Sequence, residues 1–557
     1  MFSRRSFLTR SGLAAAAATV GGAPHIARSS EALLSTPGQK PKRIIHIVSD
    51  GMSTGTLTCA DIFSQLTRKK PLTWTQLYRN PLARMAFMNT RSLNSMVTDS
   101  SAASSAWGSG SRVVNGALNI LPDGQLLTPL YALFAGAGWK TGLVTTAEIT
   151  HATPAGFATA LKSRGDSDGI AVQYFNRKID VLLGGGSPFF DPKRRKDKRD
   201  LRAEFAAAGY SVVSDRAALL SAPTDTRLLG TFAEGHLPYT IDRDAKSQAK
   251  VPSLSRMARV ALAILEQSEK FILQIEGARI DHAAHNSDAA AALHDQIALD
   301  EAIDVCLAFQ AKNPETLIVI TTDHANSNLG LTGMGGGYRT SSQRFSTLSE
   351  IKMSFPEILK RLESAGEKIK VPTFVADAED KLDVPDPMAK VDPDGKAEGE
   401  KVTEKKAEDD KTKFTAAVQT SSAFRVEPKT IIDIVADTTG YRMSERRAAM
   451  FAKVLAGEAT QLFDQMNPPI TQLGQILANH NGIGWNGNTH NADYVSLIAI
   501  GPGSEHFTGL IENTDIFHHY TALAGIDFKN ATGSLIAGGH GPEADESERP
   551  GHYAAMA

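Results

Sequence analysis

Short, continuous runs of apolar residues recur along the chain, and most of them end in small or polar residues. Such runs occupy residues 44–48, 141–145, 181–183, 271–275, 317–320 and 495–500. An amphipathic strand would alternate apolar and polar residues, whereas continuous apolar runs of this length are typical of strands buried on both faces. The pattern therefore predicts strands in the interior of a sheet.

Helical periodicity lies between these runs. In residues 255–267, Met257, Ala261, Leu262 and Leu265 recur at helical spacing, and residues 289–310 carry a similar apolar stripe. Strands that alternate with helices favour a parallel sheet with helices on both faces. The expected fold class is α/β, a three-layer α/β/α sandwich around a mostly parallel sheet.

One region interrupts the alternation. Residues 377–413 are crowded with Asp, Glu and Lys, contain three prolines and show almost no apolar periodicity, which predicts a solvated, disordered segment. A further helical pattern follows at 429–465. We therefore expect a catalytic domain at 40–325 and 485–530, interrupted by a smaller inserted subdomain at 326–484.

Composition and charge narrow the classes of protein. Of 557 residues, 42% are hydrophobic and 22% charged, as in ordinary globular proteins, and 59 Lys and Arg nearly balance 61 Asp and Glu. Without a basic excess, nothing indicates nucleic-acid binding or an anionic membrane surface. Two cysteines, Cys59 and Cys306, exclude a disulfide-dense scaffold and a thiolate metal site, and they favour two unpaired buried thiols.

The N-terminus resembles an export signal. Arg4 and Arg5 precede a weakly apolar, Ala-rich run from Gly12 to Gly22, which is too short to span a bilayer. Paired arginines in this setting are typical of a twin-arginine signal peptide, here expected at residues 1–30. The pattern predicts a partnership with the twin-arginine translocon during export, a periplasmic or secreted protein, and no stable membrane anchor.

Metal-competent residues follow several predicted strands. Asp50, Glu276 and the pair Asp323-His324 all lie at strand exits, where open parallel sheets bind ligands. Asp281 and His285 are four residues apart, so they share one face of a helix, and His490 follows a glycine-rich turn. Taken singly, each is compatible with a turn, a solvated helical pair or an ordinary loop. Together they indicate more than one divalent cation.

A candidate nucleophile lies in the sequence Val-Thr-Asp-Ser-Ser-Ala-Ala at 97–103. Small residues permit close packing behind a helix start, whose free N–H groups favour an anion. The alternative is an ordinary Ser/Ala-rich helix start with an N-cap.

These motifs together resemble the alkaline phosphatase family, in the family's order, over roughly residues 42–350 and 425–525. The resemblance implies that Ser100 is the phosphorylated nucleophile and that Arg164, eleven residues beyond Thr153, binds phosphate. It implies two Zn²⁺ and one Mg²⁺ per chain. The implied metal ligands are Asp50, Ser100, Thr153, Glu276, Asp281, His285, Asp323, His324 and His490.

Two positions vary within that family. His151 and His282 stand where some members have Asp and Lys, so we expect them to hydrogen-bond beside the metals or the phosphate, and they leave the third metal's identity open. Ser101 stands where the family often has an alanine after the nucleophile. It therefore remains an alternative to Ser100 as the nucleophile.

The implied function is hydrolysis of small-molecule phosphate monoesters to an alcohol and inorganic phosphate through a phosphoserine, by a chain that forms a homodimer. The alternatives are a phosphodiesterase or sulfatase of the same superfamily, or an idle metal-binding protein. The Cys/Ser-x-Pro-x-Arg setting of a sulfatase is absent around Ser100.

Overall fold

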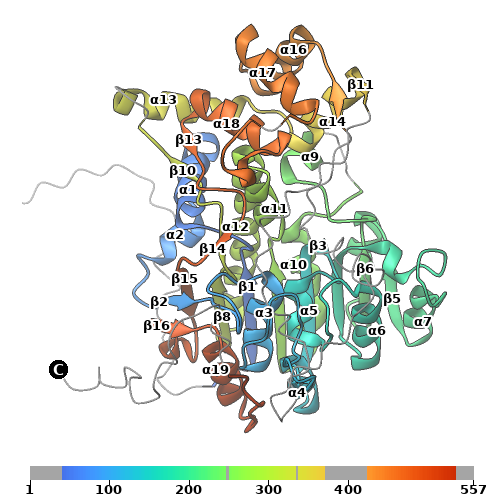
Figure 1. Cartoon of the computed structure of the whole chain (residues 1–557). Helices are drawn as coiled ribbons and strands as arrows, with labels where there is room; N and C mark the ends of the chain where they lie inside the picture. The colour runs from blue at the N-terminus through green and yellow to red at the C-terminus, as the bar shows by residue number, and fades with distance from the viewer. Residues whose placement is uncertain (1–39, 246–249, 334–336, 370–422, 459, 535–557) are drawn as a thin grey trace, which may run out of the picture.

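A ten-stranded sheet forms the centre of the molecule in the computed structural model, which describes all residues except 1–39, 246–249, 334–336, 370–422, 459 and 535–557 (Figure 1). The strand order is β16-β2-β15-β8-β1-β7-β3-β4-β6-β5. The strands are β1 (Arg43–Val48), β2 (Arg84–Asn89), β3 (Lys140–Glu148), β4 (Val181–Gly185), β5 (Tyr210–Val213), β6 (Arg227–Thr231), β7 (Phe271–Glu276), β8 (Thr316–Thr321), β15 (Val495–Ile500) and β16 (Gly509–Glu512).

All six predicted strands are present, as β1, β3, β4, β7, β8 and β15. In this sheet β15 alone runs antiparallel to its neighbours, β8 and β2, so the sheet is mostly parallel as expected. Four strands were not predicted. β5, β6 and β16 are short, and β2 exposes Met85 and Phe87 while burying Ala86 and Met88, so none of them shows a long apolar run.

Helices cover both faces of the sheet and confirm the three-layer sandwich (Figure 1). Alternate side chains of β1 enter different cores because successive residues of a strand point to opposite faces. Ile45 and Ile47 pack with α1 (Thr54–Arg68), α10 (Leu254–Leu265) and α12 (Ala289–Lys312). Ile44 and Val48 pack with residues of α4 (Leu130–Gly136), α5 (Ala152–Ala158), α6 (Ser167–Arg177) and α19 (Asp515–Ala524).

The bounds of α10 and α12 agree with the helical patterns at 255–267 and 289–310. Cys59 on α1 and Cys306 on α12 are both buried and unpaired, which confirms the expectation of two free thiols.

A separate hydrophobic core lies outside the sandwich. It draws its buried residues from positions 353–477, mainly on α14 (Phe355–Ala365), α16 (Pro428–Thr439), α17 (Glu445–Leu455) and α18 (Pro469–Asn481). Figure 1 shows these helices grouped above the sheet. Phe345, Leu348 and Ile351 instead belong to the core that contains Ile45 and Ile47 of β1. Residues just after the predicted start of the insertion therefore pack with the main body.

Two buried carboxylates join this second core to the sandwich. Asp242 accepts hydrogen bonds from both the backbone N–H and the hydroxyl of Ser354, and Asp288, the N-cap of α12, accepts the N–H of Phe355. The predicted disordered segment 377–413 and the predicted signal peptide at 1–30 lie outside the described residues.

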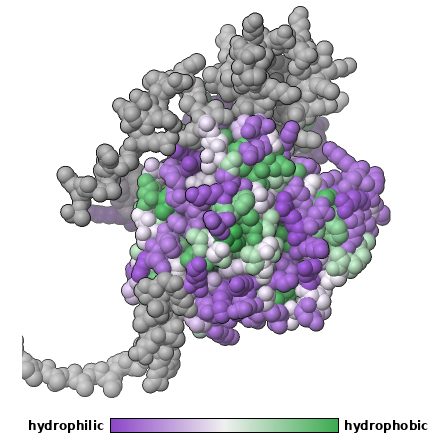
Figure 2. Space-filling view, turned by 90° about the horizontal axis from the view of Figure 1, so that it is seen from below, coloured by the Kyte–Doolittle hydropathy of each residue, from purple (hydrophilic) through white to green (hydrophobic). Residues whose placement is uncertain are grey.

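The end of the molecule opposite these helices carries mostly hydrophilic side chains around a smaller hydrophobic area (Figure 2). Within the described part of the chain, every helix is too short or too polar to cross a bilayer.

Candidate active site

The three central strands carry the first candidate residues to one edge of the sheet. β1 lies between β7 and β8, with Val48 opposite both Glu276 and Thr321. Because the strands are parallel and in register, the residues that follow them meet beyond the same edge. Asp50, Glu276, Asp323 and His324 are all fully buried there.

A first group contains Asp281, His285 and His490, whose ligand atoms lie within 4.8 Å of one another. Asp281 and His285 share one face of α11 (Arg279–His285), with His285 Nε2 at 3.3 Å from Asp281 Oδ2. His490 comes from β14 (His490–Asn491), which pairs antiparallel with β9 (Ala325–Asn326). This short ladder returns the chain from the insertion to the strand exit that carries His324.

The tautomers of both histidines are fixed by backbone carbonyls. His285 Nδ1 donates to the carbonyl of Asn488 at 2.6 Å, and His490 Nδ1 donates to the carbonyl of Thr98 at 2.9 Å. In its neutral form each imidazole therefore turns an Nε2 lone pair towards Asp281, and the two Nε2 atoms are 3.1 Å apart. Histidine ligands of metals are held in this way, by donation from the other ring nitrogen.

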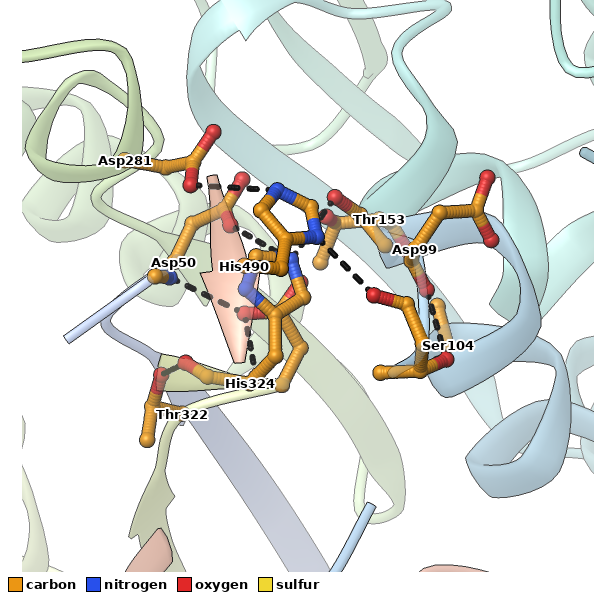
Figure 3. A network of polar contacts seen from close by, with 12 residues as sticks. Asp50, Asp99, Ser104, Thr153, Asp281, Thr322, His324 and His490 are labelled. Atoms are coloured by element: carbon orange, nitrogen blue, oxygen red, sulfur yellow. Dashed lines mark hydrogen bonds and ion pairs between the residues drawn. The ribbon is translucent and has the colours of Figure 1, made fainter. Parts of the chain in front are cut away.

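A second group contains Asp50, Asp323 and His324. His324 Nε2 lies 3.2 Å from Asp323 Oδ2, 3.5 Å from Asp50 Oδ1 and 3.2 Å from the hydroxyl oxygen of Ser100. Figure 3 shows Asp50, Asp281, His324 and His490 converging from separate elements on one small region.

A tight turn after β1 makes this convergence possible. Gly51 has φ +67°, and its N–H donates to Asp323 Oδ1 at 3.1 Å. A Cβ atom at this position would lie only 2.4 Å from Asp281 Oδ1, so the turn requires glycine for both its conformation and its space.

A third group contains Asp50, His151 and Glu276. The hydroxyl of Thr145, on β3, donates to Glu276 Oε2 at 2.5 Å. Thr153 lies on α5, and its buried hydroxyl has no hydrogen-bond partner in the described structure. His151 precedes α5 as its N-cap residue.

The electrostatics of these groups fit divalent cations. Burial, with the charges of Asp323 and Asp281 beside it, raises the pKa of Asp50 well above its usual range, and burial raises the pKa of Glu276 to about 7. Both oxygens of Asp50, Oε1 of Glu276 and Oδ2 of Asp323 lack a hydrogen bond although they are buried. Unpaired buried carboxylates are costly, and bound cations would stabilise them.

Ser100 opens α3 (Ser100–Ser109) behind the N-cap Asp99, and it is distinguished from Ser101 by its contacts. The hydroxyl of Ser101 donates to the carboxylate of Asp99 at 2.7 Å, whereas the hydroxyl of Ser100 points to His324. Helix α3 packs closely on α5, with the hydroxyl of Ser104 donating to the carbonyl of Thr153 at 2.6 Å. The small residues of the motif permit this approach.

Arg164 connects the start of α3 with the third group. Its Nη1 donates to Asp99 Oδ2 at 3.0 Å, and its Nη2 donates to His151 Nε2 at 3.2 Å. Burial opposes ionisation of Asp99, but Arg164 and the hydroxyl of Ser101 outweigh it and lower the pKa of that carboxyl. Arg164 is therefore held beside Ser100 through Asp99.

Comparison with known proteins identifies the family. The family model "Alkaline phosphatase" matches residues 41–526. The chain belongs to the alkaline phosphatase family. It is accordingly an enzyme of that family, and the resemblance seen in its motifs is confirmed.

Relatives in this family cover most of the chain. Alkaline phosphatase 3 of Bacillus subtilis is 30% identical over 482 residues, 85% of this chain and 87% of that protein. The repressible alkaline phosphatase of Saccharomyces cerevisiae is 33% identical over 375 residues, 62% of this chain and 64% of the yeast protein, so the match spans a little under two thirds of the latter. The crystal structure of Thermus thermophilus alkaline phosphatase covers 92% of this chain and 98% of its own, at 31% identity and a TM-score of 0.74.

The structure also adds residues that sequence reasoning did not select. Arg279 donates from Nη1 to Nδ1 of His282 at 2.8 Å, and the ring of His236 lies tilted against that of His282, with centroids 4.4 Å apart. His236 lies after β6 in a loop without a recognisable motif, so only its position in the fold reveals it. Asp99 could have been found from the sequence as the N-cap of the helix that begins at Ser100, because Asp is common directly before a helix.

Proposed function

We propose that the enzyme hydrolyses phosphate monoesters to an alcohol and inorganic phosphate through a phosphoserine at Ser100. The observation that carries the proposal is the convergence of three metal-competent groups beside the hydroxyl of Ser100. Ser101 is engaged with Asp99, which supports Ser100 as the nucleophile.

The donor chemistry of each group suggests its cation. Asp281, His285 and His490 would hold one Zn²⁺, and Asp50, Asp323 and His324 a second, since imidazole and carboxylate together suit zinc. Glu276, Thr153 and Asp50 offer oxygen atoms, which Mg²⁺ prefers.

His151 fits a supporting position better than a ligand position at the third site. The guanidinium of Arg164 is always a donor, so His151 Nε2 accepts from it and the proton of the neutral ring resides on Nδ1. A neutral imidazole has one free lone pair, and Arg164 occupies it. The same reasoning supports a supporting role for His282, whose Nδ1 accepts from Arg279.

When bound, divalent cations would favour the ionised hydroxyl of Ser100 and neutralise the phosphoryl oxygens. Three of them would exceed the charge of Asp50, Glu276, Asp281 and Asp323, and the surplus matches a phosphate dianion. Ser100 would attack phosphorus in line with the departing alcohol oxygen. Arg164 would bind phosphoryl oxygens with the hydrogens of its terminal nitrogens that Asp99 and His151 leave free. Water would then release phosphate from Ser100.

A phosphodiesterase or a sulfatase of the same superfamily is the second candidate. Glu276 shares a metal-competent group with His151, which contacts Arg164, and Arg164 is held through Asp99 at the start of α3. A third cation and Arg164 beside Ser100 would favour a dianionic monoester over a monoanionic diester. Because cations would meet the charge of the leaving oxygen, little contact with the alcohol is needed, and broad monoester specificity follows.

The test combines elemental analysis of the purified protein with initial rates on an aryl phosphate, a bis-aryl phosphate and an aryl sulfate. We expect close to two zinc and one magnesium per chain, and hydrolysis of the aryl phosphate at least ~100-fold faster than of the other two. A preference for the diester or the sulfate would contradict the proposal, and so would full activity in metal-free protein.

Export by the twin-arginine pathway is proposed from Arg4 and Arg5, which lie outside the described residues. Replacing both with lysine should retain the enzyme in the cytoplasmic fraction, whereas replacing Arg10 alone should not. A homodimer is likewise a prediction, and sedimentation equilibrium of the mature protein tests it.

A further inference from the structure

A group of basic side chains lies beside the third metal-competent group. Only two of its members, Arg164 and His151, have a role in the proposed mechanism. We call it the basic cluster; its members are His151, Arg164, His236, Arg279 and His282. All five are partly exposed. Ring centroids of His151 lie 5.6 Å from those of both His236 and His282, so the cluster is continuous.

The positive charge of Arg279 has no carboxylate in contact with it among the described residues, although the charge of the buried Asp295 acts on it from further away. Its guanidinium lies over the ring of Tyr239, 3.7 Å from the centroid, and donates to His282, but within the described residues it forms no ion pair. Its Nε is buried without a hydrogen-bond partner. By contrast, Arg164 is paired with Asp99.

The histidines of the cluster have fixed tautomers. The backbone N–H of Glu148 donates to His236 Nδ1 at 3.2 Å, which leaves the ring proton on Nε2. Arg279 donates to His282 Nδ1, which likewise leaves the proton of His282 on Nε2. Both rings therefore present an N–H that is not used by these contacts, and His151 Nδ1 is buried without a partner.

The positive charge of Arg279 acts on all three histidines of the cluster. Burial, reinforced by Arg279 and Arg164, lowers the pKa of His236 to about 3. Acidic groups also adjoin the cluster: Asp50 and Glu276 share the third metal-competent group with His151, and Asp99 pairs with Arg164. The charge of Asp281 acts on His282, and burial raises the pKa of Glu148, whose backbone N–H binds His236. His236 and His282 belong to none of the metal-competent groups found among the described residues.

From this juxtaposition we infer that the basic cluster is a second anion-binding subsite, which recognises an additional anionic group carried by the phosphate monoester. The inference rests on the proposed function and narrows its substrate class. Arg164 touches His151, so the phosphoryl site and the subsite are adjacent. Arg279 and the N–H groups of His236 and His282 are the donors of the subsite. A carboxylate or second phosphate two or three atoms beyond the phosphorus would reach them.

The experiment compares two phosphonates that bind without turnover. Propylphosphonate occupies only the phosphoryl site, and 3-phosphonopropionate adds a carboxylate in place of a methyl group. Their dissociation constants are measured by calorimetry on the metal-loaded enzyme. We expect the carboxylate to tighten binding at least tenfold. Because the ratio is taken within one protein preparation, changes at the phosphoryl site cancel.

Two variants locate the effect. Arg279→Gln should lower the affinity ratio at least fivefold, and His236→Phe, which keeps an aromatic ring but removes the N–H donor, should lower it two- to fivefold. Arg259→Gln, on the exposed side of α10, removes the same charge and should leave the ratio unchanged. His236→Phe also serves if Arg279→Gln does not fold.

The possible outcomes distinguish failure of the subsite from failure of the proposed function. Equal affinity for the two phosphonates in the wild-type enzyme, or a ratio unaffected by both variants, would overturn the subsite. A retained ratio in an enzyme that fails to hydrolyse an aryl phosphate would overturn the proposed function alone. Loss of both binding and hydrolysis would overturn both.

Discussion

The two sides of the active site adjoin one another and carry charges of opposite sign. On the acidic side, Asp50, Glu276, Asp281 and Asp323 are buried together, and several of their oxygens accept no hydrogen bond. On the other side, the basic cluster combines two guanidinium groups with histidines that burial and the arginines keep neutral.

This comparison shows how a chain with a formal charge of −2 can hold strong local charges of both signs. On the acidic side, burial and the neighbouring like charges raise the pKa of Asp50, and bound cations would stabilise its ionised form. The basic cluster remains partly exposed, and its Arg164 is paired with Asp99. Ser100 and Asp99 lie between the two sides, where a phosphate dianion would meet both.

Removal of bound metal should have the largest effect on the enzyme, because it acts on the acidic side of the active site. Treatment with a chelator should reduce phosphatase activity at least ~1000-fold and lower the thermal midpoint by several degrees, because bound cations stabilise only the folded acidic side. Activity assays and calorimetry with re-added Zn²⁺ and Mg²⁺ measure both effects. An unchanged midpoint would mean that the four carboxylates do not need cations.

Ser100→Ala should reduce kcat by ~1000-fold or more while leaving metal content intact, since it removes the nucleophile and only a hydroxyl's volume. Ser101→Ala is the matched control and should cost less than ~10-fold, through loss of its hydrogen bond to Asp99. Phosphoryl labelling that persists in Ser100→Ala and disappears in Ser101→Ala would reassign the nucleophile.

Arg164→Gln should lower kcat/KM for an aryl phosphate by ~10- to 100-fold without loss of metal, because it removes a charged fork from the basic side only. Arg164→Lys should recover part of the loss through charge alone. Steady-state kinetics with elemental analysis distinguishes this effect from damage to the acidic side. Metal loss in Arg164→Gln would show that the two sides are not independent.

Asp288 differs from the carboxylates of the acidic side. It is buried and accepts hydrogen bonds, but it belongs to none of the metal-competent groups found among the described residues. Burial raises its pKa to about 7, against about 3.9 in an unfolded chain. The folded state therefore binds the proton more tightly, and stability present below pH 4 is lost as the pH rises towards 7.

Asp288→Asn should lose stability at every pH, since an amide cannot accept from both Ala291 and Phe355. Its free energy of unfolding should nevertheless fall less steeply than that of the wild type between pH 5 and 7, by ~2 kcal/mol over this range. Urea unfolding at several pH values measures the slope. Parallel slopes for the two proteins would contradict the raised pKa.

Much of the fold was predictable because burial on both faces leaves a strong local signal. The strands next to the site, β1, β7 and β8, were identified from apolar runs that end one to three residues before Asp50, Glu276 and Asp323. The edge strand β16 and its neighbour β2 were missed because they are partly exposed and their patterns are weak.

The sequence by itself determined which residues follow the central strands, and these include every residue of the three metal-competent groups except His490, which lies on β14. Their motifs also carried the resemblance to the family. Such residues are predictable because short-range order along the chain sets both strand exits and helix spacing.

Tertiary structure alone decided which distant groups face one another. It paired β14 with β9 so that His490 returns to Asp281, and it fixed the tautomers of His285 and His490 through carbonyls far along the chain. It also placed Arg279 and His236 beside His282. Hydrogen bonds and ion pairs across the sheet edge depend on three-dimensional proximity, and loop residues without periodicity carry no local signal of their partners.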